Sequence, residues 1–170
     1  MRTIGLISDT HGLVREEVFI ALRGVDLILH AGDVGGADAL LALAKIAPVR
    51  AVRGDHDAAD AAGFEPRIDE MFEQVRVVVT HGHELERADP PRIVSAYMHA
   101  DVIVYGHTRL PLITRAARRL VINPGAAGES YVGTSPTVAR LYIDGRQSDA
   151  QLIRLFPADP DEQPPEFDER

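Results

Sequence analysis

Five short apolar runs, rich in valine and isoleucine, recur along the first two thirds of the chain. Near-continuous apolar runs of this length are typical of strands that are buried on both faces. The pattern therefore predicts five buried strands. They span Arg2–Ser8, Leu27–His30, Val49–Arg53, Val75–Thr80 and Val102–Tyr105.

Segments with the apolar spacing of helices lie between these runs. Helices are predicted over Arg15–Leu22, Ala37–Ala44 and Pro91–His99, and Asp89 is placed to cap the third. Strands that alternate with helices indicate βαβ units and a largely parallel sheet. The fold class is therefore predicted to be α/β.

The last third of the chain has the pattern of antiparallel hairpins, with turns such as Asp144-Gly145. We expect this material to form a second sheet that packs on the first. Its strands are predicted over Leu110–Ala116, Arg119–Ile122, Thr137–Ile143 and Gln151–Phe156.

The end of the chain differs in composition from the rest. Residues 157–170 contain four prolines, six acidic residues and one phenylalanine. So little apolar surface cannot offset the entropy lost on ordering the segment. We therefore predict one domain at 1–156 and a flexible acidic, proline-rich tail at 157–170.

Charge and composition exclude several classes of protein. The net charge of -8 disfavours general binding to nucleic acid, and an aromatic content of 5% without tryptophan disfavours a stacking platform for single strands. Cysteine is absent, so any metal must be held by oxygen or imidazole ligands. No run approaches the roughly 20 apolar residues of a membrane span, and Met1–Ser8 is too short for a signal peptide. We expect a cytoplasmic protein.

Each predicted buried strand ends in a cluster of residues that commonly bind metals. The carboxyl ends of parallel strands line the ligand crevice of an α/β sheet, so the clusters would meet there. Three clusters pair side chains two residues apart, which point to the same side in an extended chain. Such ligands suit Mn, Fe, Ni, Zn or Mg. The clusters are Ser8-Asp9-Thr10-His11, His30-Ala31-Gly32-Asp33, Gly54-Asp55-His56-Asp57, His81-Gly82-His83 and Gly106-His107-Thr108-Arg109.

Taken singly, several of these residues have plainer explanations. Asp33 alone could cap a helix or form a turn, and Asp57 could do the same. His30 is best explained as a packed core histidine, and His99 as a partner of a helix end. Packing does not explain five such clusters at five strand ends, so the set as a whole predicts a metal site.

The order of the motifs resembles the signature of the calcineurin-like metallophosphoesterases, above all their small single-domain bacterial and archaeal branch. The likeness spans about residues 1–155 and includes the loop Ile122-Asn123-Pro124-Gly125. It implies a four-layer αββα sandwich in which two mixed β-sheets are flanked by helices. It also implies that a dinuclear metal centre activates water to hydrolyse a small phosphodiester or phosphomonoester.

The resemblance assigns roles to the clustered side chains. Mn²⁺ is the expected ion, with Fe, Zn, Ni or Mg as alternatives. His56 stands where the family has a general acid, and His83 is a candidate to support a ligand. The first ion would be held by Asp9, His11 and Asp33, and the second by Asp33, Asp55, His81 and His107.

Two positions depart from the family pattern. The family usually has asparagine in place of Asp55 and a histidine ligand of the first metal in place of Arg109. A missing ligand and an added guanidinium predict a weaker first site, and Arg109 is suited to bind the substrate phosphate.

A second hypothesis therefore stays open. The retromer scaffold subunit, a non-catalytic relative, also has aspartate at the position of Asp55, although it lacks a histidine at that of His56. The chain would then be a weak or inactive scaffold that binds a protein partner. A nuclease is disfavoured by the charge of -8. Because relatives are often dimers, we also expect a homodimer.

Overall fold

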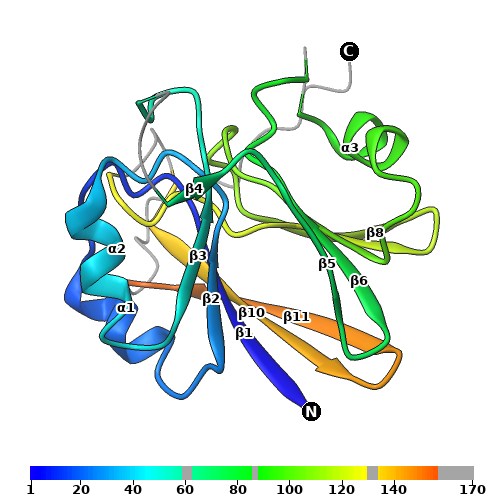
Figure 1. Ribbon diagram of the computed structural model, residues 1–170, viewed down its shortest axis with the longest axis horizontal. Helices are drawn as coiled ribbons and strands as arrows, with labels where there is room; N and C mark the ends of the chain where they lie inside the picture. Colours follow the sequence, from blue (N-terminus) through cyan, green and yellow to red (C-terminus); the bar gives the residue numbers. More distant parts are fainter. Residues whose placement is uncertain (59–62, 86–87, 130–133, 157–170) are drawn as a thin grey trace.

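Two β-sheets lie face to face in the computed structural model, and helices cover the outer face of each (Figure 1). The structure describes residues 1–58, 63–85, 88–129 and 134–156. The four layers and the two mixed sheets confirm the predicted αββα sandwich. The tail predicted at 157–170 lies outside the described residues, so its flexibility stays a prediction.

The first sheet has six strands in the order β11-β10-β1-β2-β3-β4. Strands β1 to β4 run parallel, and β10 and β11 extend the sheet as an antiparallel hairpin beside β1. The strands are β1 (Arg2–Ile7), β2 (Leu27–His30), β3 (Val49–Val52), β4 (Phe64–Glu65), β10 (Thr137–Asp144) and β11 (Gln147–Arg154).

The second sheet has five strands in the order β5-β6-β7-β9-β8. Strands β6, β7 and β9 run parallel, and an antiparallel strand lies at each edge. The strands are β5 (Ile68–Phe72), β6 (Val75–Val79), β7 (Val102–Val104), β8 (Leu112–Ala116) and β9 (Arg119–Asn123).

The distribution of strands between the sheets corrects the sequence prediction. The five buried strands do not form one sheet, because β1, β2 and β3 belong to the first sheet and β6 and β7 to the second. The hairpins of the last third are likewise divided, since β10 and β11 join the first sheet and β8 and β9 the second. Strand β11 also begins earlier than predicted, because Asp144 pairs with Gln147 across a two-residue turn.

Alternation along the strands builds the core. Ile4 and Leu6 of β1 pack in the cluster between the two sheets, whereas Ile7 packs in the cluster beneath the first two helices. Helices α1 (Glu16–Ala21) and α2 (Ala37–Leu43) cover the first sheet in Figure 1. Fully burying each such side chain contributes about 1.5–3 kcal/mol. The strands that carry the site are therefore held firmly.

Helix α3 (Pro90–Ala96) covers the outer face of the second sheet. Asp89 caps it as predicted, since its side chain accepts a hydrogen bond of 3.1 Å from the amide of Arg92. The helix ends three residues before His99, whose Nε2 lies 2.9 Å from Asp69 Oδ2. The interpretation of His99 as a partner of the helix end is therefore wrong, because its partner is a carboxylate on β5.

Candidate metal centre

The loops that follow five parallel strands meet at one edge of the sandwich. Asp9 follows β1, Asp33 follows β2 and Asp55 follows β3, while His81 follows β6 and His107 follows β7. Parallel strands in both sheets end at this edge, so the prediction that their carboxyl ends converge holds although two sheets are involved.

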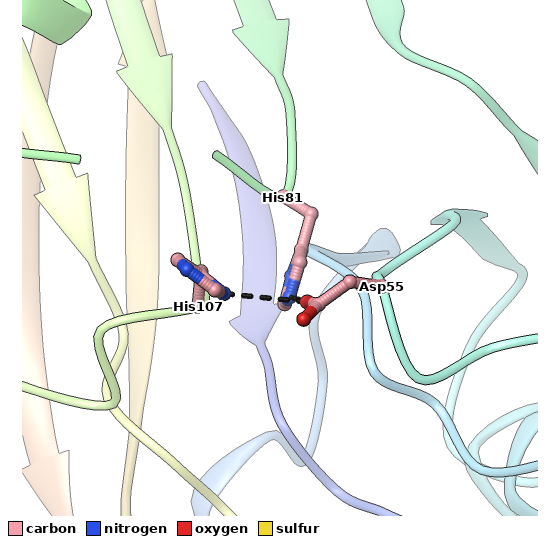
Figure 2. Close-up of side chains that lie close together, drawn as sticks. All are labelled: Asp55, His81 and His107. Atoms are coloured by element: carbon pink, nitrogen blue, oxygen red, sulfur yellow. Dashed lines mark hydrogen bonds and ion pairs between the residues drawn. The ribbon is translucent and has the colours of Figure 1, made fainter. Parts of the chain in front are cut away.

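One group of potential ligands consists of Asp55, His81 and His107, and its ligand atoms all lie within 4.8 Å of one another. Figure 2 shows the two histidines approaching the carboxylate from separate loops. Asp55 Oδ1 lies 2.9 Å from His81 Nε2 and 3.3 Å from His107 Nδ1. Asp33 Oδ1 lies 3.4 Å from the same nitrogen of His81. The four residues predicted for the second ion are thus brought together.

A second group consists of Asp9, His11 and Asp33, again within 4.8 Å of one another. His11 Nε2 lies 3.6 Å from Asp33 Oδ2. Asp33 therefore contacts both groups, as a bridging ligand must. Arg109 reaches into the group, with its Nη2 2.6 Å from His11 Nε2 and its Nε 3.8 Å from Asp9 Oδ1.

His56 lies at the exposed rim of the site. Its Nδ1 is 2.8 Å from Asp33 Oδ2, and its backbone amide donates to Asp33 Oδ1 over 3.0 Å. The ring is 61% exposed, whereas the Asp33 side chain is 2% exposed. A third group of potential ligands consists of Asp33, Asp55 and His56. His83 joins none of the three groups found among the described residues, although its ring centroid lies 5.4 Å from that of His81.

The backbone around the ligands is not extended. Asp9, His11, Asp33, His107 and Arg109 have φ between 45° and 62°. This left-handed region is uncommon for residues other than glycine and costs on the order of 1–3 kcal/mol per residue. The prediction that i, i+2 pairs converge through extended chain is therefore wrong. Tight left-handed turns aim these side chains instead.

Two glycines allow the loops to approach the ligands closely. A Cβ atom on Gly54 would lie 2.1 Å from Asp33 Oδ1, and one on Gly32 would lie 2.5 Å from His81 Nδ1. No side chain fits at either position without moving a ligand.

Electrostatics link the buried ligands. Burial alone would lower the pKa of His81, but hydrogen bonds to Asp33 and to the carbonyl of Ala31 raise it to about 9. Burial would raise the pKa of Asp33, but hydrogen bonds from His81 and His56 lower it. An ion that binds His81 would compete with the proton that these hydrogen bonds favour. The hydrogen bond from its Nδ1 to Ala31 (2.7 Å) leaves Nε2 as the nitrogen that faces the carboxylates.

Asp9 supplies an independent sign that the site fits a cation. Burial raises the pKa of its carboxyl group. One oxygen accepts a hydrogen bond of 2.5 Å from the Ser8 hydroxyl, whereas Oδ1 is buried without a hydrogen-bond partner among the described residues. Such an oxygen costs about 1–3 kcal/mol, and a divalent ion would satisfy it. Carboxylate oxygens and imidazole nitrogens without sulfur suit Mn, Fe, Zn, Ni or Mg.

Residues outside the ligand set hold the loops in place. Asp57, which the sequence placed only in a turn, accepts hydrogen bonds from the amides of Gly54 (2.8 Å), Val34 (3.1 Å) and Gly35 (2.9 Å). It therefore ties the loop of Asp33 to the loop of Asp55. No sequence signal distinguishes this role from that of an ordinary turn former.

The loop of His107 is held by Asn123, whose amide donates to the carbonyl of Gly106 and to the hydroxyl of Thr108, each over 2.9 Å. The resemblance to the family includes the loop Ile122-Asn123-Pro124-Gly125, but the sequence assigns no role to Asn123. His30 is confirmed as a core histidine. It is buried, its Nε2 lies 2.8 Å from the Thr10 hydroxyl, and burial lowers its pKa to about 3.

The chain is similar in sequence to known metallophosphoesterases. Residues 1–146 match the calcineurin-like phosphoesterase superfamily domain. A protein of Methanothermobacter thermautotrophicus named as a probable metallophosphoesterase is 39% identical over 160 residues, covering 89% of this chain and 91% of its own length.

Solved structures share the fold. A novel archaeal phosphodiesterase superposes with a TM-score of 0.71 at 21% identity, covering 89% of this chain and 99% of its own. Vps29 from Entamoeba histolytica, complexed with Zn²⁺, superposes with a TM-score of 0.73 at 19% identity, covering 91% and 99%. Among the described residues, no helix is long and apolar enough to cross a membrane. The cytoplasmic location and the homodimer stay predictions.

Proposed function

Because this chain belongs to the calcineurin-like phosphoesterase superfamily, we propose that it hydrolyses a small phosphodiester or phosphomonoester with the help of divalent metal ions. One observation carries the proposal. Asp33 belongs to the ligand group of Asp9 and His11 and also lies 3.4 Å from His81 of the other group. A buried carboxylate oxygen of Asp9 in the same centre lacks a hydrogen-bond partner among the described residues.

The ligand set divides between two ions, for which Mn²⁺ is the proposed metal. When bound, they would lower the pKa of a water and neutralise the phosphoryl oxygens. We assign the first ion to Asp9, His11 and Asp33, and the second to Asp33, Asp55, His81 and His107. The second has more protein ligands and is the tighter site.

His56 and Arg109 are the proposed catalytic residues. The exposed ring of His56 is anchored through Nδ1 to Asp33, so its Nε2 can face a substrate at the mouth of the site. During hydrolysis the water oxygen bonds to phosphorus as the ester P–O bond breaks, and protonated His56 gives its proton to the departing oxygen. Arg109 would bind phosphoryl oxygens through its guanidinium.

A scaffold that keeps the fold and presents a surface to a protein partner remains the second candidate. The Vps29 structures give it some support. So does the guanidinium of Arg109, which lies against His11 where the first ion would bind. The two ideas differ in a simple observable, since only an enzyme turns over a phosphate ester.

The test is steady release of 4-nitrophenol from bis(4-nitrophenyl) phosphate, with 4-nitrophenyl phosphate as the monoester. We expect hydrolysis of at least one substrate with Mn²⁺, loss of it in EDTA, and recovery when Mn²⁺ is restored. Absence of turnover on both substrates with every one of the five candidate metals would favour the scaffold.

A further inference from the structure

A cavity of about 370 Å³ lies beside the ligand group of Asp55, His81 and His107. Several residues that line it are close neighbours of these ligands in the sequence. Arg53 precedes Asp55 by two residues, and Thr80 immediately precedes His81. His83 also lines the cavity, and its ring centroid lies 6.4 Å from the ring of His107. A substrate held at Asp55, His81 and His107 would therefore have this cavity next to it. The cavity could hold the part of the substrate that does not react.

One wall of the cavity is a closed network around Glu84. Its carboxylate accepts hydrogen bonds from the Thr80 hydroxyl, the Gly82 amide (3.0 Å) and the Tyr97 hydroxyl (2.8 Å). Three donors inside the protein thus engage both oxygens. The network fixes the ring of Tyr97 and leaves Glu84 little capacity to bind a cationic ligand.

Arg67 stands in the same cavity. Its guanidinium carbon lies 5.7 Å from the centre of the Tyr97 ring, and it makes no ion pair with any residue that the structure describes. Nearby arginines are paired differently. Arg50 contacts Glu65 at 2.8 Å, and Arg76 contacts Asp69 at 2.8 Å. In a chain with a net charge of -8, an arginine beside the metal centre that has no acidic partner among the described residues is a specific feature.

We propose that this cavity binds a second anionic group, a carboxylate or a phosphate, on the part of the substrate that is not transferred. The proposal rests on the function proposed above. The planar guanidinium of Arg67 offers paired donors that match such groups, and the cavity beside it has room for one. The preferred substrate is thus a phosphate ester with a second negative charge.

Equilibrium binding tests this separately from turnover. Titration calorimetry on Mn²⁺-loaded protein would compare alkylphosphonates of two to four carbons with phosphonocarboxylates and bisphosphonates of the same lengths. None can be hydrolysed, and the two anionic series distinguish carboxylate from phosphate. Arg67→Gln keeps hydrogen-bonding capacity without the charge. Arg146→Gln is the matched control, since Arg146 contacts Gln74 (3.0 Å) at the opposite ends of the strands.

We expect the wild type to bind at least one anionic series about tenfold more tightly than the alkyl series. One hydrogen bond between charged groups contributes about this much affinity. In Arg67→Gln this preference falls close to one, and in Arg146→Gln it is retained. A wild type that binds all series equally, or none, would overturn the proposal, as would an unchanged preference in a folded Arg67→Gln protein. Hydrolysis of bis(4-nitrophenyl) phosphate, measured in parallel, reports on the proposed function independently.

Discussion

We predict that Arg109 limits how many metal ions the site holds. A metal bonded to His11 Nε2 stands about 2 Å from that nitrogen. Arg109 Nη2 already lies 2.6 Å from the same atom, so the guanidinium and an ion cannot both occupy this place. The arginine must withdraw before the first ion binds.

The size of the penalty follows from this contact. Breaking a hydrogen bond to a charged group costs about 1.5–3 kcal/mol, which corresponds to about 10- to 150-fold in affinity. Arg109→His removes this competitor and adds an imidazole ligand. Histidine tolerates the left-handed φ of 59° at this position at least as well as arginine does, so the backbone does not oppose the substitution.

Mn²⁺ titration by calorimetry, with electron paramagnetic resonance to detect paired ions, measures the effect. We expect one tight ion in the wild type, with a second bound at least tenfold more weakly, and two ions of similar affinity in Arg109→His. Arg109→Gln separates removal of the charge from addition of a ligand, and Arg146→His is the surface control. Two equally tight ions in the wild type, or an unchanged first site in Arg109→His, would refute the reasoning. If Arg109→His tightens the site yet lowers activity, Arg109 serves the phosphate.

Three further predictions concern other parts of the chain. His56→Ala should lower turnover about 10²- to 10⁴-fold on esters with poor leaving groups while metal affinity changes little, and equal turnover would remove the acid role. His30 has a native pKa of about 3 against 6.5 when unfolded, so the unfolded state binds more protons as pH falls below 6.5. Urea unfolding should therefore show about 2 kcal/mol lost between pH 6.5 and 5, and His30→Asn should flatten that slope rather than run parallel to the wild type. Removing residues 157–170 should leave the melting temperature and hydrolysis nearly unchanged, and a drop of many degrees would show that the segment is docked.

The elements with strong local signals were predictable. Strand Leu27–His30 agrees with its predicted bounds, and Asp89 caps its helix as expected. Strand β5, Ile68–Phe72, was missed because only its two end residues are buried and its middle is exposed. The division of parallel strands between two sheets was also missed. Buried strands in either sheet carry the same apolar pattern, and only long-range pairing decides which sheet they join.

The sequence predicts that the ligand side chains meet in one place, but not the geometry in which they meet. The order of motifs pointed to Asp9, Asp33 and His81, and all three lie in the clusters. The left-handed turn at Asp9 and the hydrogen bonds of Asp57 to two loops depend on backbone conformation, which residue identity alone does not determine. The cavity beside Arg67 combines segments far apart in the chain, so no local pattern announces it.

The central claim is that Asp33 joins the two ligand groups of a metal centre that hydrolyses phosphate esters. The most direct measurement is Mn²⁺ content and hydrolysis of bis(4-nitrophenyl) phosphate together, in the wild type, in Asp33→Asn and in the control Asp149→Asn, an exposed residue of β11. The account predicts that Asp33→Asn loses both bound Mn²⁺ and turnover while the control keeps both. Wild-type hydrolysis that persists in EDTA, or an Asp33→Asn protein that binds Mn²⁺ and turns over like the wild type, would contradict it.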